Sequence, residues 1–74
     1  MFLKCPQDVR IKFIERLKIF KLNKHDSALN NHNLSGKYKE YKSINVSGNY
    51  RAIFEETPDH IKFIAIGTHS QLYK

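Results

Sequence analysis

The spacing of apolar residues changes once along this chain of 74 residues, and that change is the strongest constraint on its fold. Before Gly36 the interval is three or four, which places the apolar residues on one face of a helix: Val9, Phe13, Ile14, Leu17 and Phe20. After Gly36 the interval becomes two, which is typical of half-buried strands. A helix followed by several strands predicts an α+β domain, with an N-terminal helix packed on a small antiparallel β-sheet.

The helix is predicted over residues 7–21. Pro6 suits a helix start because its missing N–H would have no helical partner there. Asp8 puts a negative charge near the positive end of the helix dipole. The polar stretch 24–35 is typical of a connection and contains a short helical turn near 27–31. The first half of the chain is therefore expected to hold one long helix and a loop.

Three strands are predicted where β-branched and aromatic residues are frequent: 41–46, 50–55 and 61–66. Gly48 and Asn49 tolerate the positive φ of a tight hairpin, and Pro58 ends the second strand. We expect Gly67 to end the third strand and residues 71–73 to form a short terminal strand. The core should join two sets of apolar residues across the helix–sheet interface: Val9, Phe13, Leu17 and Phe20 against Ile44, Val46, Ile53, Ile64 and Ile66.

Length and charge limit the function. The chain allows a single domain, residues 1–74, with no room for a nucleotide-binding fold beside a substrate domain. Lys and Arg number 13 against 7 Asp and Glu, and a net charge of +6 favours a polyanionic partner: nucleic acid, an anionic membrane or an acidic protein. Cys5 has no second cysteine to pair with, and no apolar run reaches the length of a signal peptide or a membrane span. We therefore expect a cytoplasmic protein.

Histidine is the side chain that transfers protons near neutral pH, and the chain has four: His25, His32, His60 and His69. RNA cleavage by side chains needs one group to take the 2′-hydroxyl proton, another to protonate the leaving 5′ oxygen, and cations to stabilise the phosphorane. His69 follows a predicted strand and His32 lies in the loop before the sheet, whereas the other two have no supporting pattern. By itself, any one histidine is more often structural or solvated. The chain has no CxxC or HxxxH motif, so a zinc site is not predicted.

Three segments resemble the RelE/YafQ group of bacterial toxins, within the RelE/ParE superfamily. Residues 34–46 (LSGKYKEYKSINV) resemble the group's LxGxxxGxR segment, residues 47–54 (SGNYRAIF) its following hairpin, and residues 67–73 (GTHSQLY) its GTHSxL-F/Y ending. The resemblance extends over residues 2–74 and implies a RelE-like fold. It also implies the toxin of a type II toxin–antitoxin system, an mRNA endoribonuclease that often acts on the ribosome. The implied partners are a cognate antitoxin, mRNA and the ribosome, with no metal, small-molecule cofactor or membrane.

The resemblance further implies the site residues. His69 and His32 would exchange protons, and Arg51 would hold the scissile phosphate. Tyr73 would stack on a base or donate its hydroxyl. The full set of catalytic candidates is His69, His32, Arg51, Tyr73, Asn49 and Asn45. The candidates for RNA binding, which interleave with Tyr38 and Tyr41, are Lys37, Lys39 and Lys42.

Structural alternatives to these roles stay open. Arg51 could form a salt bridge with Glu55 or Glu56 instead of holding a phosphate. Tyr73 could simply cover the edge of the sheet. The lysines and tyrosines of residues 37–42 could form a solvated entrance to the first strand.

The chain departs from the family pattern at three points. It begins near the family's Leu-Pro turn, at Cys5-Pro6, without the usual first strand and a further helix, so we expect a shortened gene or a misplaced start codon. Asn49 stands where an aspartate is usual, which removes a carboxylate. Lys42 replaces a common arginine, which keeps the charge but loses bidentate phosphate contact. The alternative hypothesis is therefore a non-catalytic remnant that binds only antitoxin or RNA.

Overall fold

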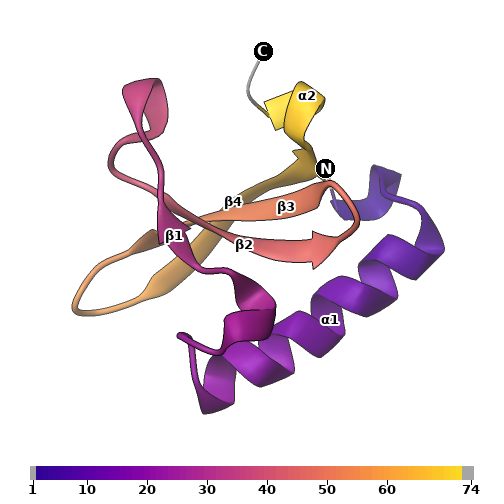
Figure 1. The fold of residues 1–74 in the computed structure, drawn as a ribbon, viewed down its shortest axis with the longest axis horizontal. Coiled ribbons are helices and arrows are strands. Elements are labelled where there is room, and N and C mark those ends of the chain that lie inside the picture. The colour runs from indigo at the N-terminus through magenta and orange to yellow at the C-terminus, as the bar shows by residue number, and fades with distance from the viewer. Residues whose placement is uncertain (1, 73–74) are drawn as a thin grey trace.

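The computed structural model describes residues 2–72, which form a four-stranded antiparallel sheet with a long helix on one face (Figure 1). The strand order is β1-β2-β3-β4, so strands adjacent in the chain are adjacent in the sheet. The elements, with η marking a 3₁₀ helix, are η1 (Phe2–Lys4), α1 (Gln7–Leu22), η2 (Ser27–Leu29), β1 (His32–Asn33), η3 (Gly36–Tyr38), β2 (Lys42–Ser47), β3 (Tyr50–Glu56), β4 (Ile61–Thr68) and α2 (His69–Leu72). The predicted α+β class is confirmed. Within the described residues, no helix has the length and apolar character that crossing a membrane requires.

Helix α1 buries a narrower stripe than the spacing predicts. Val9 is buried, and Phe13, Ile19 and Phe20 pack against the core. Ile14, which we expected in the same stripe, is 48% exposed. Five residues of α-helix turn Ile14 about 140° away from Val9, whereas four residues turn Phe13 only about 40° away. The prediction for Ile14 is therefore wrong.

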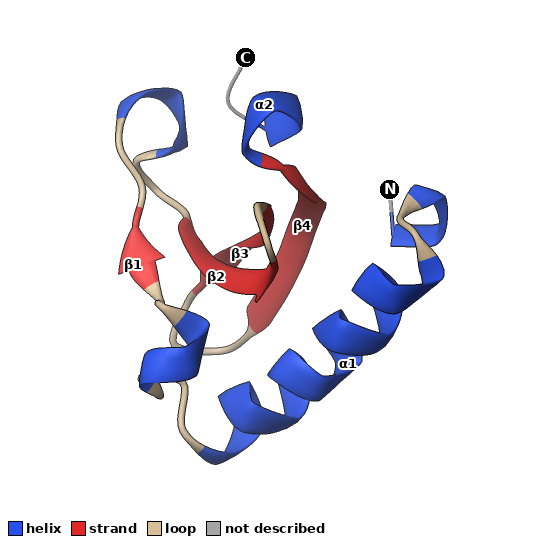
Figure 2. Cartoon of the chain, turned by 45° about the vertical axis from the view of Figure 1, so that its right-hand side comes forward, coloured by secondary structure: helices blue, strands red, loops and turns tan. Residues whose placement is uncertain are grey.

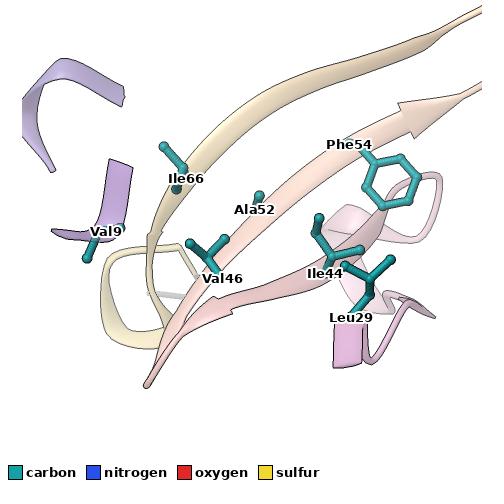
Figure 3. Close-up of a cluster of buried hydrophobic side chains, with 7 residues drawn as sticks. All are labelled: Val9, Leu29, Ile44, Val46, Ala52, Phe54 and Ile66. Carbon is teal, nitrogen blue, oxygen red and sulfur yellow. The ribbon is translucent and has the colours of Figure 1, made fainter. Parts of the chain in front are cut away.

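The core lies between α1 and the sheet, with η2 closing one end (Figure 3). Its buried members are Val9, Leu29, Ile44, Val46, Ala52, Phe54 and Ile66. Three expected members do not belong to it, and one of them, Leu17, is only partly buried and lies outside the cluster. Ile53 is fully buried, but strand alternation places it on the face opposite Ala52 and Phe54. Ile64 is the extra residue of a β-bulge in β4 and is 40% exposed.

The strand predictions fail at the C-terminal end. Gly67 does not end β4, because it pairs with Arg51 and the strand continues to Thr68. The terminal strand expected at residues 71–73 is also wrong, since His69–Leu72 forms helix α2. Tyr73 lies outside the described residues.

A capping box explains the terminal helix. The backbone N–H of Thr68 donates to Gln71 Oε1 at 2.9 Å, and the backbone N–H of Gln71 donates to Thr68 Oγ1 at 3.2 Å. A threonine followed three residues later by a glutamine is the sequence signature of this helix start. Gly67 leaves room for the accepting oxygen, because a Cβ at that position would lie 2.9 Å from Gln71 Oε1. The first residue of α2, His69, is thereby fixed at the end of β4.

A small cluster of charges joins three segments of the chain. Glu56, at the end of β3, accepts hydrogen bonds from Lys24 Nζ at 2.5 Å and from Lys42 Nζ at 2.6 Å. Both hydrogen bonds lower the pKa of Glu56, from 4.5 to about 2, and the bond from Lys24 has the larger effect. Lys24 follows α1 and Lys42 begins β2, so the carboxylate connects the helix end to the sheet.

The capping box yields a first prediction, tested with Gln71→Ala. This change removes the side chain that accepts from Thr68 and should lower the free energy of unfolding by roughly 0.3–1.5 kcal/mol, the usual contribution of one capping feature. Urea denaturation of Gln71→Ala measures the loss. Ser70→Ala, an exposed change in the same helix, is the control and should be close to neutral. Equal stability of the two variants would contradict the prediction.

The pKa of Glu56 yields a second prediction. Because the pKa is lower in the folded chain, the stabilisation is present above pH 4.5 and is lost as the pH falls toward about 2. As the pH falls through that range, the wild type should lose roughly 1 kcal/mol more of its free energy of unfolding than Glu56→Gln. The difference is this small because both lysines are partly solvated. Denaturation curves from pH 6 downward, with exposed Glu40→Gln as control, measure this difference. Parallel pH profiles for wild type and Glu56→Gln would rule out the linkage.

Candidate active site

A polar hollow of about 390 Å³ opens on the face of the sheet opposite α1. It is lined by His32, Asn33, Leu34, Ser35, Arg51 and His69. The loop after β1 and helix α2 both stand on this side of the sheet (Figure 2). The hollow therefore brings together three predicted catalytic residues, from β1, β3 and α2.

Arg51 lies at the base of the site, because its place in the ladder is between Asn45 of β2 and Gly67 of β4. Its Nε donates to Ser43 Oγ at 3.0 Å, and its Nη1 donates to Asn45 Oδ1. Its Nη2 donates to the backbone oxygen of Asn30 at 3.3 Å. All three acceptors are neutral, so they orient the guanidinium without neutralising it.

The salt bridges considered for Arg51 do not form. Glu55 contacts His60 Nε2 at 3.0 Å, and Glu56 binds the two lysines described above. Arg51 therefore keeps its positive charge at the hollow, where it can attract an anion.

His32 belongs to the short strand β1 and pairs with Ser43, whereas we expected it in a loop. Its Nδ1 lies 2.9 Å from the backbone oxygen of Asn30 and 3.2 Å from Arg51 Nη2. A carbonyl oxygen can only accept, so the shorter contact requires a proton on Nδ1. In the neutral ring Nε2 is then the nitrogen that accepts a proton.

His69 is exposed at the first position of α2. Its backbone N–H donates to the backbone oxygen of Asn49 at 3.2 Å, which ties α2 to the β2–β3 turn. Gly48 has a φ of +54° in that turn, as a two-residue hairpin requires of its first position. Asn49 is exposed and does not line the hollow, whereas Asn45 contributes through its bond to Arg51.

The three lysines predicted to bind RNA do not lie together in the structure. Lys37 lies in η3 and Lys39 follows it, both exposed and close in the chain to Ser35 of the hollow. Lys37 Nζ lies 5.2 Å from the ring centre of Tyr38, a cation–π contact. Lys42 does not join them, because it pairs with Glu56 on the helix side of the sheet.

Two residues that support the site were not predicted. Ser43 is fully buried in β2 and accepts from Arg51. Asn30 has a left-handed φ of +46°, and this turn directs its backbone oxygen toward both His32 and Arg51. The sequence could have indicated the role of Asn30, because asparagine is the non-glycine residue that most readily ends a helical turn in the left-handed conformation.

The arrangement combines two titratable rings with a fixed cation. Histidine can take or give a proton near neutral pH, and a planar guanidinium can bind a phosphate through two N–H groups. No group of three His, Cys, Asp or Glu side chains in residues 2–72 is placed to hold a metal ion. His32, His69 and Arg51 are suited to acid–base chemistry beside an anion.

Comparison with known proteins gives a match in structure alone. No family model matches this chain, and no curated protein matches it. Among solved structures, a copper-bound mutant toxin from Helicobacter pylori has a similar fold, with a TM-score of 0.67. The two sequences are 21% identical, and the match covers 95% of this chain and 77% of the toxin chain. The chain therefore shares the fold of a bacterial toxin.

Proposed function

We propose that this chain is the toxin of a toxin–antitoxin pair and acts as an mRNA endoribonuclease, in association with the ribosome. The observation that carries the proposal is the convergence of His32, Arg51 and His69 at one hollow. The fold shared with the Helicobacter pylori toxin and the resemblance of residues 34–54 and 67–73 to RelE/YafQ toxins support the same function.

In the proposed reaction His32 is the general base. Its unprotonated Nε2 takes the proton of a ribose 2′-hydroxyl while the 2′ oxygen bonds to the adjacent phosphorus. The bond from phosphorus to the 5′ oxygen breaks, and that oxygen receives a proton from protonated His69. The products are a 2′,3′-cyclic phosphate and a free 5′-hydroxyl, and exchange with solvent restores both rings.

Arg51 stabilises the charge that develops on the phosphorane. Because Ser43, Asn45 and Asn30 already hold its guanidinium, little reorganisation is needed when the phosphate arrives. Lys37 and Lys39 would contact the RNA backbone beside the hollow.

One observation favours the alternative, a remnant that binds antitoxin or RNA without cutting. Among residues 2–72 no carboxylate lines the hollow, and the turn residue Asn49 stands where the resembled family has an aspartate. A single measurement distinguishes the two functions: whether the isolated chain cleaves mRNA in the presence of ribosomes.

The catalytic prediction concerns His69→Gln. Glutamine is polar but cannot titrate, so folding and RNA affinity should be preserved while single-turnover mRNA cleavage falls roughly 10²–10⁴-fold. Arg51→Lys should also slow cleavage, because a point charge replaces a planar fork. His25→Gln is the matched control, since His25 is exposed and outside the hollow.

Equal cleavage by wild type and His69→Gln would remove His69 from the mechanism. No cleavage by wild type, with antitoxin binding intact, would select the non-catalytic alternative. Asn49→Asp would then be the first variant to test for rescue.

The partner prediction concerns an antitoxin encoded beside this chain. A net charge of +6 favours an acidic or amphipathic antitoxin segment. Co-expression with the adjacent small reading frame should yield a complex that purifies together and does not cleave mRNA. Recovery of the chain without a bound partner, from cells that express both genes, would contradict this prediction.

A further inference from the structure

The ring nitrogen Nδ1 of His32 lies beside two groups that make opposite demands on it. The backbone oxygen of Asn30, at 2.9 Å, can only accept a hydrogen bond, so it requires a proton on Nδ1. Arg51 Nη2, at 3.2 Å, can only donate, so a hydrogen bond to the ring requires Nδ1 without a proton. A neutral imidazole cannot meet both demands at one nitrogen. The tautomer of His32 is therefore decided by competition between Asn30 and Arg51.

The geometry of the site favours Asn30 in this competition. Its oxygen is the nearer of the two partners of Nδ1. The same oxygen also accepts from Arg51 Nη2 at 3.3 Å, which gives the guanidinium an acceptor other than the ring. One carbonyl group thus serves both donors, and it keeps the ring proton on Nδ1.

The direction of this oxygen depends on an uncommon backbone conformation. Asn30 has a φ of +46° and a ψ of +50°, in the left-handed region that disfavours most residues with a Cβ. Rotation about ψ moves the carbonyl oxygen of the same residue. Asn30 must therefore keep the left-handed conformation for its oxygen to reach His32.

The turn that precedes Asn30 is fixed to the core. Leu29, the last residue of η2, is fully buried in the core cluster. Asp26 Oδ1 accepts from the backbone N–H of Ala28 at 2.9 Å, and the backbone N–H of Asn30 donates to the oxygen of Ser27 at 3.2 Å. Asn30 itself is exposed, so its side chain can be replaced without a change in core packing.

We propose that Asn30 is a positioning residue of the candidate active site, and that its backbone oxygen selects the tautomer of His32 against Arg51. With the oxygen in place, Nδ1 carries the ring proton and Nε2 keeps a lone pair for a substrate proton. With the oxygen turned away, Arg51 Nη2 donates to Nδ1. The Nδ1 proton is then lost to water, and Nε2 takes one from water. No ring nitrogen is left to act as a base.

The use of Nε2 as a base rests on the proposed function, whereas the choice of tautomer does not. The ring proton can be located without RNA. A chain that cuts no mRNA but shows the tautomers described here would keep this proposal and reject the proposed function. A chain that cuts mRNA with the His32 proton on Nε2 would do the reverse.

The test locates the ring proton of His32 by NMR in the full chain, labelled with ¹⁵N in its histidine rings. Long-range ¹H–¹⁵N spectra above about pH 8, where an imidazole is neutral, show which nitrogen carries the proton. His32→Gln identifies the signals by their loss. The wild type should carry the proton on Nδ1, and Asn30→Gly should do the same, because glycine adopts a positive φ without strain.

Asn30→Ala is the variant that should move the proton. Its Cβ makes the left-handed conformation costly, so the population ratio of the Nδ1–H ring to the Nε2–H ring should fall roughly tenfold. If the proposed function holds, single-turnover cleavage at saturating mRNA should fall with this ratio in Asn30→Ala and not in Asn30→Gly.

Asn31→Ala is the matched control in the same turn. It removes the hydrogen bond from Asn31 Nδ2 to the backbone oxygen of Lys24, at 3.0 Å, and leaves the backbone oxygen of Asn30 in place. The tautomer ratio of His32 should therefore change less than about twofold, which is small beside the effect of a strained φ.

Four results would overturn the proposal. The first is a wild-type ring with its proton on Nε2. The second is an unchanged ratio in folded Asn30→Ala, and the third is an equal shift in Asn30→Ala and Asn31→Ala. The fourth is failure of Asn30→Ala to fold, checked by circular dichroism, since Asn30 would then hold the fold together and not merely position the ring.

Discussion

The pairing of β3 on both sides is the constraint on which the rest of the structure depends. A strand paired on both sides has a fixed register, so its successive side chains must point to opposite faces. Ala52 and Phe54 enter the core beneath α1, whereas Arg51 points to the other face. A slip of one residue would bury the arginine in the core and expose the phenylalanine. The hydrophobic pattern that folds the domain therefore also places the cation of the site.

The position of Arg51 explains why its surroundings are polar and neutral. A guanidinium beside a buried region needs acceptors for its N–H groups, and a carboxylate there would cancel the charge. Ser43, Asn45 and the backbone of Asn30 satisfy it without a negative charge. Ser43 is fully buried, so its hydroxyl gains a partner from the same bond. One set of hydrogen bonds thus satisfies these polar groups and leaves the charge of the guanidinium available to an anion.

The sequence predicted what depends on periodicity and missed what depends on tertiary context. The helix and the three long strands follow from apolar spacing, and the GTHS ending drew attention to His69. Ile14 was misplaced because an apolar residue can fall outside the helix stripe, and Ile64 because a bulge leaves no trace in the spacing. Helix α2 was predicted as a strand, although Thr68 and Gln71 form a capping box that the sequence displays. Ser43 could not be found, since its role appears only when β2 and β3 pair.

The long helix and the candidate active site lie on opposite faces of the sheet. One helix of 16 residues spans about 24 Å on one face, where it packs on the core, and Ile64 of β4 stays 40% exposed. A chain this short gains little stability from its core, and any ligand that binds only the folded state adds to that stability by mass action. A ligand bound at the hollow would thus stabilise the sheet, including the strand that carries Arg51. Strand β4 and the site are linked through β3, which pairs with β4 on one side and presents Arg51 to the hollow.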